Sequence, residues 1–184
     1  MGIILRDVFG RRAPRNTEPR DARFMEDALR RWGDTVYRVA LGQTGSPSDA
    51  EDVCQDVFVR LLRDRTAFTS EEHLKAWLIR VALNRCHDLA RSRWSRRIPW
   101  DDQQAEKALH VSPTTTPAEE SIRELIALLP EDQRATVTLY YAEGYPAAEV
   151  GRILGCSAGA VRTRLSRIRE TLRRQLEDRR GDPR

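Results

Sequence analysis

The chain of 184 residues carries a formal net charge of +4, and its hydrophobic content of 40% suffices for one domain or two small ones. No apolar run approaches the roughly 20 residues of a membrane-spanning helix, so no membrane segment is expected. The apolar run at residues 3–5 is too short for the core of a signal peptide. Only two of the 32 basic residues are lysine. Arginine suits phosphate and base contacts, although a GC-rich genome produces the same bias.

Three cysteines, Cys54, Cys86 and Cys156, and three histidines are scattered along the chain. No spacing among them resembles a metal or redox motif. The sequence therefore predicts buried or incidental thiols in a reducing cytoplasm, with no metal site and no cofactor.

The first helix is expected from about Asp21 to Gln43, and Gly42 and Gly45 mark its end. Its apolar stripe consists of Met25, Leu29, Trp32, Val36 and Ala40. Residues 1–20 mix arginine with proline and lack apolar periodicity, which predicts a flexible basic tail.

A second helix is expected from near Ser48, which lies three residues before Glu51 and forms a capping box with it. The inward face consists of Ala50, Val53, Val57, Leu61 and Leu62. Asp52 and Asp56 share another side of the helix, where two like charges four residues apart are slightly destabilising. Solvation is the ordinary explanation of such a face, but a basic partner surface would remove the repulsion.

A polar loop from Asp64 to Ser70 follows and contains one aromatic residue, Phe68. Thr69 and Glu72 form a second capping box, which begins a third long helix. Its apolar positions are Leu74, Trp77, Leu78, Val81 and Leu89. The far end of this helix is rich in arginine and includes a tryptophan. Basic residues near a helix C-terminus are favourable for dipole reasons alone, but rings among arginines also suit single-stranded DNA.

Residues 98–116 are polar and contain proline, which makes them the best domain boundary. Thr116 then caps a helix that ends before Pro130, and a further helix is expected from Glu131 to Ala142. The apolar face of the first of these helices consists of Ile122, Leu125, Ile126 and Leu129.

Residues 144–176 have the pattern of a helix-turn-helix that continues into a long basic helix. A short helix is expected from Pro146 to Leu154, followed by a left-handed Gly155 and by Ser157 as the cap of the next helix. The inward stripe of that helix consists of Val161, Leu165, Ile168 and Leu172, whereas Arg162, Arg164, Arg167 and Arg169 lie off the stripe. This division is typical of a recognition helix in the major groove. A solvated arginine-rich helix is the ordinary alternative. Because no segment has the pattern of a strand, the expected fold class is all-α.

Four segments in this order resemble the extracytoplasmic-function (ECF) group of bacterial RNA polymerase sigma factors, which keep only regions 2 and 4. The segments are residues 49–61, 76–93 and 128–145 and the helix-turn-helix. The resemblance implies a three-helix region 2 domain at residues 21–97 and a four-helix region 4 domain at 117–177. A flexible linker at residues 98–116 would join them, and residues 178–184 would form a C-terminal tail.

The resemblance also implies which residues bind each partner. The acidic second helix would bind the β′ coiled coil of core RNA polymerase through Asp49, Glu51, Asp52, Gln55 and Asp56. The loop after it would capture a base flipped out of the downstream (−10) promoter element. Residues implied for that element are Arg65, Phe68, Asn84, Arg85, Asp88, Arg91, Arg93 and Trp94. The last helix would read the upstream (−35) element as duplex through Ser157, Arg162, Arg164, Ser166 and Arg167.

Further implied partners are the β flap of the polymerase and an anti-sigma factor, and no catalysis is expected of this chain. Two departures from the family pattern, Ala160 and Gly151, could lower affinity for the upstream element. Promoter elements two DNA turns apart lie roughly 70 Å from each other, whereas a relaxed linker of this length spans about 25 Å. A scaffold such as polymerase must therefore hold the domains apart.

Two alternatives come from other classes of protein. One is a stand-alone helix-turn-helix regulator whose N-terminal helices serve dimerisation or sensing, although the acidic face of the second helix has no use there. The other is an enzyme in which His73 pairs with Cys86 or His87, but no nucleophile elbow, phosphate loop or metal spacing supports it.

Overall fold

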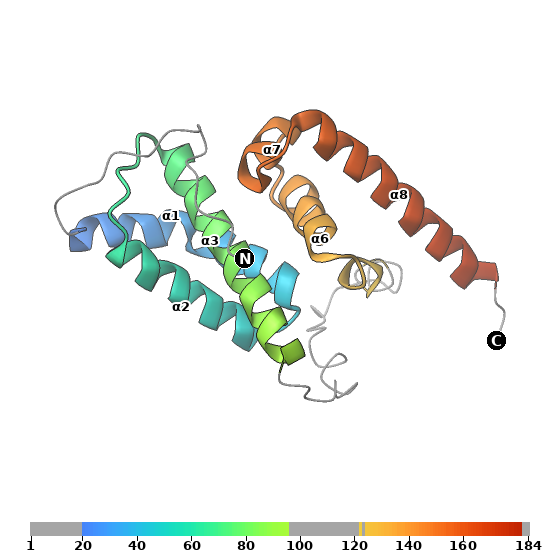
Figure 1. The fold of residues 1–184 in the computed structure, drawn as a ribbon, viewed down its shortest axis with the longest axis horizontal. Helices are drawn as coiled ribbons and strands as arrows, with labels where there is room; N and C mark the ends of the chain where they lie inside the picture. Colours follow the sequence, from blue (N-terminus) through green and yellow to red (C-terminus); the bar gives the residue numbers. More distant parts are fainter. Residues whose placement is uncertain (1–19, 96–121, 123, 182–184) are drawn as a thin grey trace.

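The computed structural model describes residues 20–95, 122 and 124–181, and each secondary-structure element in this part of the chain is a helix. The expectation of an all-α fold is confirmed. The N-terminal half contains α1 (Ala22–Thr44), α2 (Pro47–Arg63) and α3 (Glu71–Ser95). The C-terminal half contains α6 (Glu131–Val137), the π-helical segment η1 (Thr138–Ala142), α7 (Ala147–Leu154) and α8 (Ala158–Gly181). Figure 1 shows the two halves side by side, with α8 extending away from both.

Several expected features fall at the edges of the described chain. Of the tail expected at residues 1–20, only Arg20 is described, and the linker at 98–116 and the cap at Thr116 lie outside the described residues. Helix α8 continues to Gly181, past residue 177, where the second domain was expected to end. Among the described helices, none has the length and apolar character needed to cross a membrane.

The helix ends are set by local caps, two of which differ from the predicted ones. Helix α1 begins after Asp21, whose side chain accepts from the Phe24 N–H at 2.7 Å, and it ends at the left-handed Gly45. Ser46, rather than Ser48, caps α2, because Pro47 can occupy a first helical position. At the start of α3, the hydroxyl of Ser70 rather than Thr69 accepts from the N–H of the third residue of the helix, at 3.1 Å.

The three helices of the N-terminal half enclose one apolar cluster, here called the N-terminal core. Its fully buried members include Val36, Ala40, Ala50, Val53, Val57, Leu61 and Leu78. Three residues predicted to lie on an inward face are exposed instead: Ile122 of the C-terminal half by 41% and, in this half, Leu29 by 56% and Leu62 by 51%. On α1 and α2 the preceding residue, Ala28 or Leu61, takes the inward place, because adjacent positions point about 100° apart.

The helix-turn-helix forms as the sequence predicts. Gly155 is left-handed with φ 71° and ends α7, and the Ser157 hydroxyl accepts from the Ala160 N–H at 3.1 Å. A Cβ on Gly151 would lie 2.6 Å from the carbonyl oxygen of Cys156, so the turn folds back closely onto this position. The predicted stripe packs inward, with Val161, Leu165 and Ile168 buried and Leu172 partly buried. Gly151 is therefore a packing requirement of this turn.

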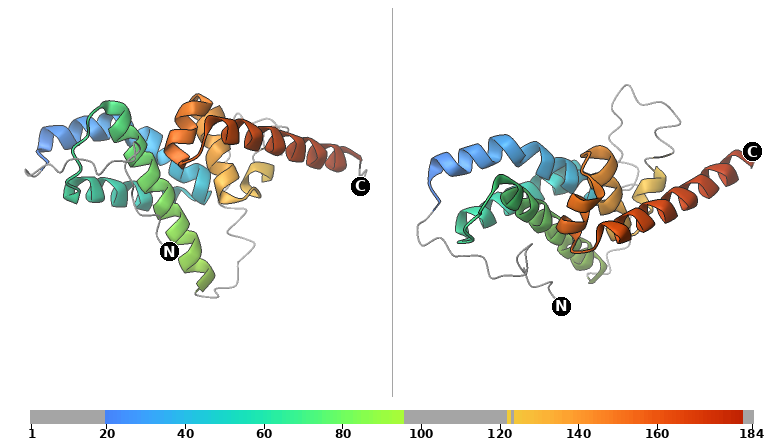
Figure 2. Two further views of the ribbon diagram at one scale, coloured as in Figure 1. Left: turned by 45° about the horizontal axis from the view of Figure 1, so that its top comes forward. Right: turned by 90° about the horizontal axis from the view of Figure 1, so that it is seen from above.

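The two halves pack against each other through a second apolar cluster, here called the shared cluster. It joins Val39, Ala76 and Ile79 of the N-terminal half to Leu139, Val150, Ile153, Val161 and Leu165 of the C-terminal half. In both views of Figure 2, α6 and α7 lie against the side of the N-terminal half that α1 and α3 form. Gly42 lies inside α1, rather than at its end, and faces Thr138 of η1 closely.

Candidate protein and nucleic-acid interfaces

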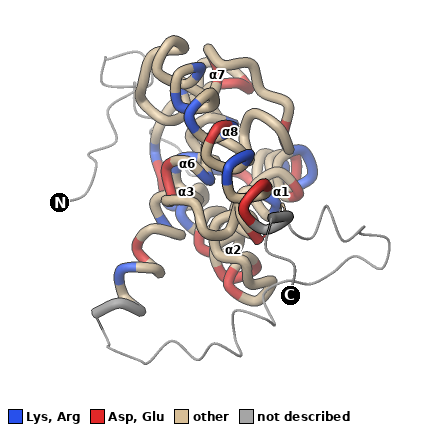
Figure 3. The backbone as a smooth tube through the Cα atoms, turned by 90° about the vertical axis from the view of Figure 1, so that its right-hand side faces the viewer, with Lys and Arg blue, Asp and Glu red and all other residues tan. Residues whose placement is uncertain are grey.

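The outer face of α2 carries exposed acidic and apolar side chains in one row. Glu51, Asp52 and Gln55 are exposed, and acidic positions gather on α2 in Figure 3. The same face continues at helical spacing to Val59 and Leu62, which are 45% and 51% exposed. A surface that combines carboxylates with exposed aliphatic groups suits a partner with basic and apolar side chains. The sequence analysis placed Leu62 on the inward face and gave Val59 no role. Val59 lies four residues after Gln55 and three before Leu62, and this spacing could have indicated the row.

Part of the acidic face already has a basic partner within the chain. The carboxylate of Asp56 forms an ion pair with Arg85 of α3, with Nε and Oδ2 2.5 Å apart. Both side chains remain about half exposed, so water and salt screen the pair. Asp49 lies half-buried at the start of α2, where its N–H bonds to the Ser46 hydroxyl at 3.3 Å. The residues assigned to polymerase and to the downstream element therefore meet where α2 and α3 pack.

The loop at residues 64–70 is anchored by its own side chains. Asp64 accepts from the Thr66 N–H at 2.7 Å, which forms a local turn. Phe68 points inward and makes edge-to-face contacts with His73 and Trp77, with ring centroids 5.4 and 5.7 Å apart. Arg65 is exposed. Phe68 is thus an anchor of the loop, while its ring also contributes to a hollow beneath it.

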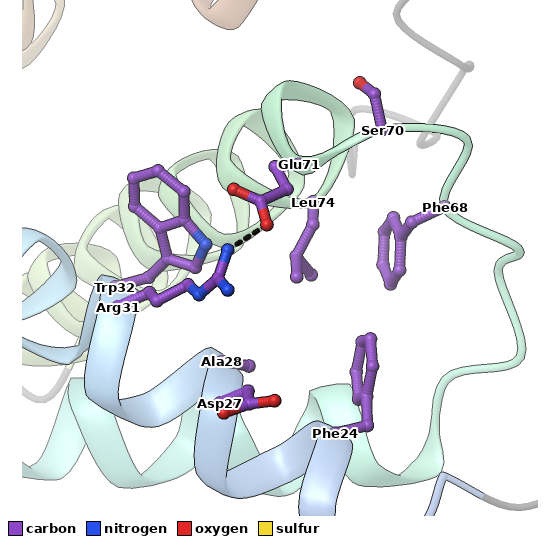
Figure 4. A pocket seen from close by; sticks show the side chains of 9 residues that line it. All are labelled: Phe24, Asp27, Ala28, Arg31, Trp32, Phe68, Ser70, Glu71 and Leu74. Carbon is purple, nitrogen blue, oxygen red and sulfur yellow. Dashed lines mark hydrogen bonds and ion pairs between the residues drawn. The ribbon is translucent and has the colours of Figure 1, made fainter.

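That hollow has a volume of about 240 Å³ and lies between α1, the loop and the start of α3. Figure 4 shows the rings of Phe24, Trp32 and Phe68 around it, with an ion pair between Arg31 and Glu71 at one side. The remaining lining residues are Asp27, Ala28, Ser70 and Leu74. It is smaller than the roughly 300 Å³ at which drug-sized ligand pockets begin. Its size and aromatic walls suit one planar group.

Four residues assigned to the downstream element lie at the far part of α3. Asn84 and Arg85 are half-buried, whereas Asp88 and Arg91 are exposed. Asn84, Asp88 and Arg91 follow one another at spacings of four and three and therefore share one face. The side chains of Arg93 and Trp94 lie outside the described residues.

The residues assigned to the upstream element lie on the N-terminal part of α8, with Ser157 just before the helix. Ser157, Arg162, Ser166 and Arg167 are exposed. Arg164 is only 28% exposed, because its guanidinium forms an ion pair with Asp132 of α6 at 3.4 Å and donates to Thr136 Oγ1 at 3.1 Å. Figure 3 shows basic positions recurring along α8. Arg164 is thus held against its own domain.

Charged side chains surround the shared cluster, and the sequence analysis assigned none of them a role. Arg38 donates to both carboxylate oxygens of Glu143, at 2.7 and 3.0 Å, and this hydrogen bonding raises the pKa of Arg38. Lys75 forms an ion pair with Glu149 at 2.5 Å, and Arg80 donates to the carbonyl oxygens of residues 152 and 153 at the end of α7. These contacts join residues far apart in the chain, so no local pattern could have indicated them.

The structure does not support a catalytic pair of His73 and Cys86. Burial raises the pKa of Cys86 to about 12, and His73 is buried against Phe68. A thiol with so high a pKa is a poor nucleophile, because the thiolate is the reactive form.

The chain matches two protein-family descriptions, Sigma-70 region 2 over residues 28–96 and Sigma-70, region 4 over residues 119–172. It is 31% identical over 150 residues to the probable RNA polymerase sigma factor RfaY of Xanthomonas campestris pv. campestris, a match that covers 77% of this chain and 38% of RfaY. It is 30% identical over 161 residues to the ECF RNA polymerase sigma factor SigE of Mycolicibacterium smegmatis, covering 82% and 61%. The match thus spans less than two thirds of the length of both relatives.

A solved structure has the same fold. The sigma factor RpoE of Bartonella quintana, crystallised with the anti-sigma factor NepR, superposes with a TM-score of 0.64 at 23% identity. The match covers 83% of this chain and 96% of that one.

Proposed function

The chain belongs to the ECF group of sigma-70 RNA polymerase sigma factors, and on that basis we propose that it directs core RNA polymerase to specific promoters and helps to melt them. Members of this family regulate transcription and are not enzymes. RNA synthesis is then performed by the polymerase, in the cytoplasm, while this chain recognises the DNA.

The main structural support for this proposal is the outer face of α2. Exposed carboxylates at positions 51 and 52 lie beside an exposed aliphatic end at Val59 and Leu62. Such a face is suited to a basic and apolar surface such as the β′ coiled coil of the polymerase. The repulsion between neighbouring carboxylates would then be relieved by the partner, as it already is in part for Asp56 by Arg85.

Downstream promoter DNA would bind along α3 and the loop at residues 64–70. Asn84, Asp88 and Arg91 supply polar and charged groups on one face of α3. The hollow below the loop offers aromatic walls to a base extruded from the duplex, and stacking there offsets the few kcal/mol that extrusion costs. The exposed residues of α8 would read the upstream element in the major groove.

Promoter binding would require the two halves to separate. Elements two DNA turns apart lie roughly 70 Å from each other, whereas here the halves share one apolar cluster. Polymerase would hold them apart. An anti-sigma factor that binds the chain would prevent this, and the structural relative from Bartonella quintana was crystallised with such a partner.

The test is binding of purified core polymerase by the full chain, comparing wild type with Asp52→Arg. Reversing this exposed charge should weaken the complex at least about tenfold, because an attraction becomes a repulsion at the contact. Glu26→Arg on α1 is the matched control, since it makes the same change at an exposed site away from α2. It should bind like wild type. Asp56→Arg is less informative, because it also removes the ion pair with Arg85.

Two outcomes would contradict the proposal. If the wild type does not bind polymerase but binds duplex DNA tightly alone, the chain is a stand-alone regulator. If it binds polymerase and Asp52→Arg binds equally well, the docking face lies elsewhere.

A further inference from the structure

Arg20 lies just before α1 and reaches across to the loop at residues 64–70. Its Nε donates to the carbonyl oxygen of Leu61 at 3.0 Å, and Nη2 donates to that of Thr66 at 2.6 Å. The first carbonyl is in the last turn of α2, where carbonyl groups have no partner within the helix. One guanidinium therefore connects the end of α2 to the middle of the loop.

The same guanidinium also lies over two aromatic rings. Its central carbon lies 4.7 Å from the centroid of Phe24 and 4.6 Å from that of Phe68, both within the range of cation–π attraction. These two rings also line the hollow shown in Figure 4. Burial lowers the pKa of Arg20, and the nearby Asp64 carboxylate opposes that shift. Arg20 is thus held against the loop and the aromatic wall of the hollow together.

We propose that Arg20 is a positioning residue for promoter melting: it fixes the loop and the Phe24–Phe68 wall in the geometry that accepts an extruded base. The proposal rests on the proposed function, in which that loop captures a base. Stacking of a base on an aromatic ring favours binding, and all of this gain reaches the affinity only if the rings are held in place before the base binds. Without Arg20, binding would have to order the loop, and the ordering entropy would be subtracted from the affinity.

Lysine cannot replace arginine in this role. A planar guanidinium presents several donors in fixed directions and stacks on rings at the same time, whereas an ammonium is a compact charge without that geometry. Arg20→Lys keeps the positive charge but cannot reproduce two directed hydrogen bonds and two ring contacts together. The two substitutions therefore separate the geometry of the side chain from its charge.

The experiment uses holoenzymes assembled from core polymerase and the full chain. The wild-type holoenzyme first selects a promoter from a random-sequence duplex library by run-off transcription. Short non-template single strands from that promoter, with each of the four bases at the captured position, are then titrated by fluorescence anisotropy. Arg20→Ala should bind the best strand about tenfold more weakly, by loss of two charge-assisted hydrogen bonds that order the loop. Its preference among the four bases should fall towards none, and Arg20→Lys should lie between Arg20→Ala and wild type.

The matched control is Arg23→Ala, which removes the same charge from an exposed position three residues further along the chain. It should retain wild-type affinity and preference, and all variants should bind core polymerase and the upstream duplex normally. Unchanged base preference in Arg20→Ala, or an equal loss in Arg23→Ala, overturns the proposal. If Arg20→Ala also fails to bind core polymerase, Arg20→Lys is the deciding variant. Normal polymerase binding with a reduced preference among the four bases supports the positioning role, and an unchanged base preference overturns it. A wild type that selects no promoter refutes the proposed function itself.

Discussion

The N-terminal core and the shared cluster both contain fully buried aliphatic side chains, but they differ in what surrounds them. The N-terminal core is closed by three helices of one half. The shared cluster joins two halves and is surrounded by Arg38, Lys75 and Arg80, which all reach from α1 or α3 to the C-terminal half. Interfaces that open typically combine an apolar centre with a charged rim, whereas permanent cores do not. The difference indicates that the first cluster holds the fold together and the second holds one arrangement of the halves.

Neighbouring residues of α3 give the largest expected contrast. Leu78 belongs to the N-terminal core and Ile79 to the shared cluster, and both are fully buried. Leu78→Ala should lower the free energy of unfolding by about 2–5 kcal/mol, through lost burial and the cavity left behind. Ile79→Ala removes a similar volume, but it should weaken the packing between the two halves rather than the stability of the N-terminal half. Urea unfolding measures the first effect, and the distance between dyes on the two halves measures the second.

Transcription by the holoenzyme separates the same two variants. Polymerase would hold the halves apart, so Ile79→Ala should transcribe at or above the wild-type level, whereas Leu78→Ala should lose activity as its N-terminal half unfolds. If Ile79→Ala destabilised the chain as much as Leu78→Ala and left the dye distance unchanged, the two clusters would not differ in this way.

Removing the charge of Lys75 should have the next largest effect on the packing of the two halves against each other. Its ammonium lies 2.5 Å from the Glu149 carboxylate, 4.4 Å from the ring centroid of Tyr145, and is 12% exposed. Lys75→Met leaves Glu149 buried without its partner, which should weaken closure by about 2 kcal/mol, below the range for fully buried pairs because some water reaches both groups. Closure here means the packing of the two halves against each other through the shared cluster. The distance between dyes on the two halves should show a larger share of molecules with the halves apart.

Two further variants test whether the ion pair is the cause. Lys75→Met combined with Glu149→Gln should restore much of the closure, because no unpaired charge then remains. Arg31→Met breaks the exposed pair with Glu71 inside the N-terminal half and should change closure little. Equal opening by Lys75→Met and Arg31→Met would show that the position of the charge does not matter.

A smaller effect is expected where α1 meets η1. A Cβ on Gly42 would lie 2.9 Å from Oγ1 and 3.3 Å from Cγ2 of Thr138. Gly42→Ala should therefore weaken closure by about 1 kcal/mol through overpacking, while alanine stabilises α1 itself. Adding Thr138→Ala removes both crowding atoms and should bring the dye distance back to the wild-type value. Failure of this second change to restore closure would place the strain elsewhere.

The sequence predicted what depends on neighbouring residues and missed what depends on distant ones. The turn at Gly155 and Ser157 was predictable because its chemistry is complete within a few residues. Leu29 and Leu62 were misplaced because each is next to another apolar residue at the edge of its stripe, and periodicity cannot choose between them. The ion pair of Arg38 with Glu143, 105 residues away, has no local signal.

The candidate site was predicted in the same uneven way. The acidic residues of α2 and the arginines of α8 were proposed from their pattern and from the family resemblance, and most of them are exposed, which a binding role needs. The engagement of Arg164 with Asp132 and the contacts of Arg20 with the loop depend on how separate helices pack. A basic side chain in a tail has no feature in the sequence that distinguishes an anchor from a solvated charge.

The smallest expected effect is on the alkylation rate of a cysteine, which reports on the contact between the halves without a further substitution. Cys86 of α3 belongs to the N-terminal core, and its burial together with the Glu131 carboxylate of α6 raises its pKa to about 12. Opening the halves should move this carboxylate away, so the pKa should fall, while burial in the N-terminal core still holds it above the ordinary value for a thiol. Alkylation of Cys86 by iodoacetamide at pH 8 should then be measurably faster in Ile79→Ala than in wild type, since only the thiolate reacts.

Cys54 provides the internal control for that measurement. Its sulfur lies 3.7 Å from the carbonyl oxygen of Gly33, between α1 and α2, and burial raises its pKa as well. Because this contact lies within the N-terminal half, opening should leave its alkylation rate unchanged. Acceleration at Cys86 alone would mean that α6 moves away while the N-terminal core stays closed, whereas equal acceleration at both thiols would mean that the N-terminal core loosens too and that the two clusters are one cooperative unit.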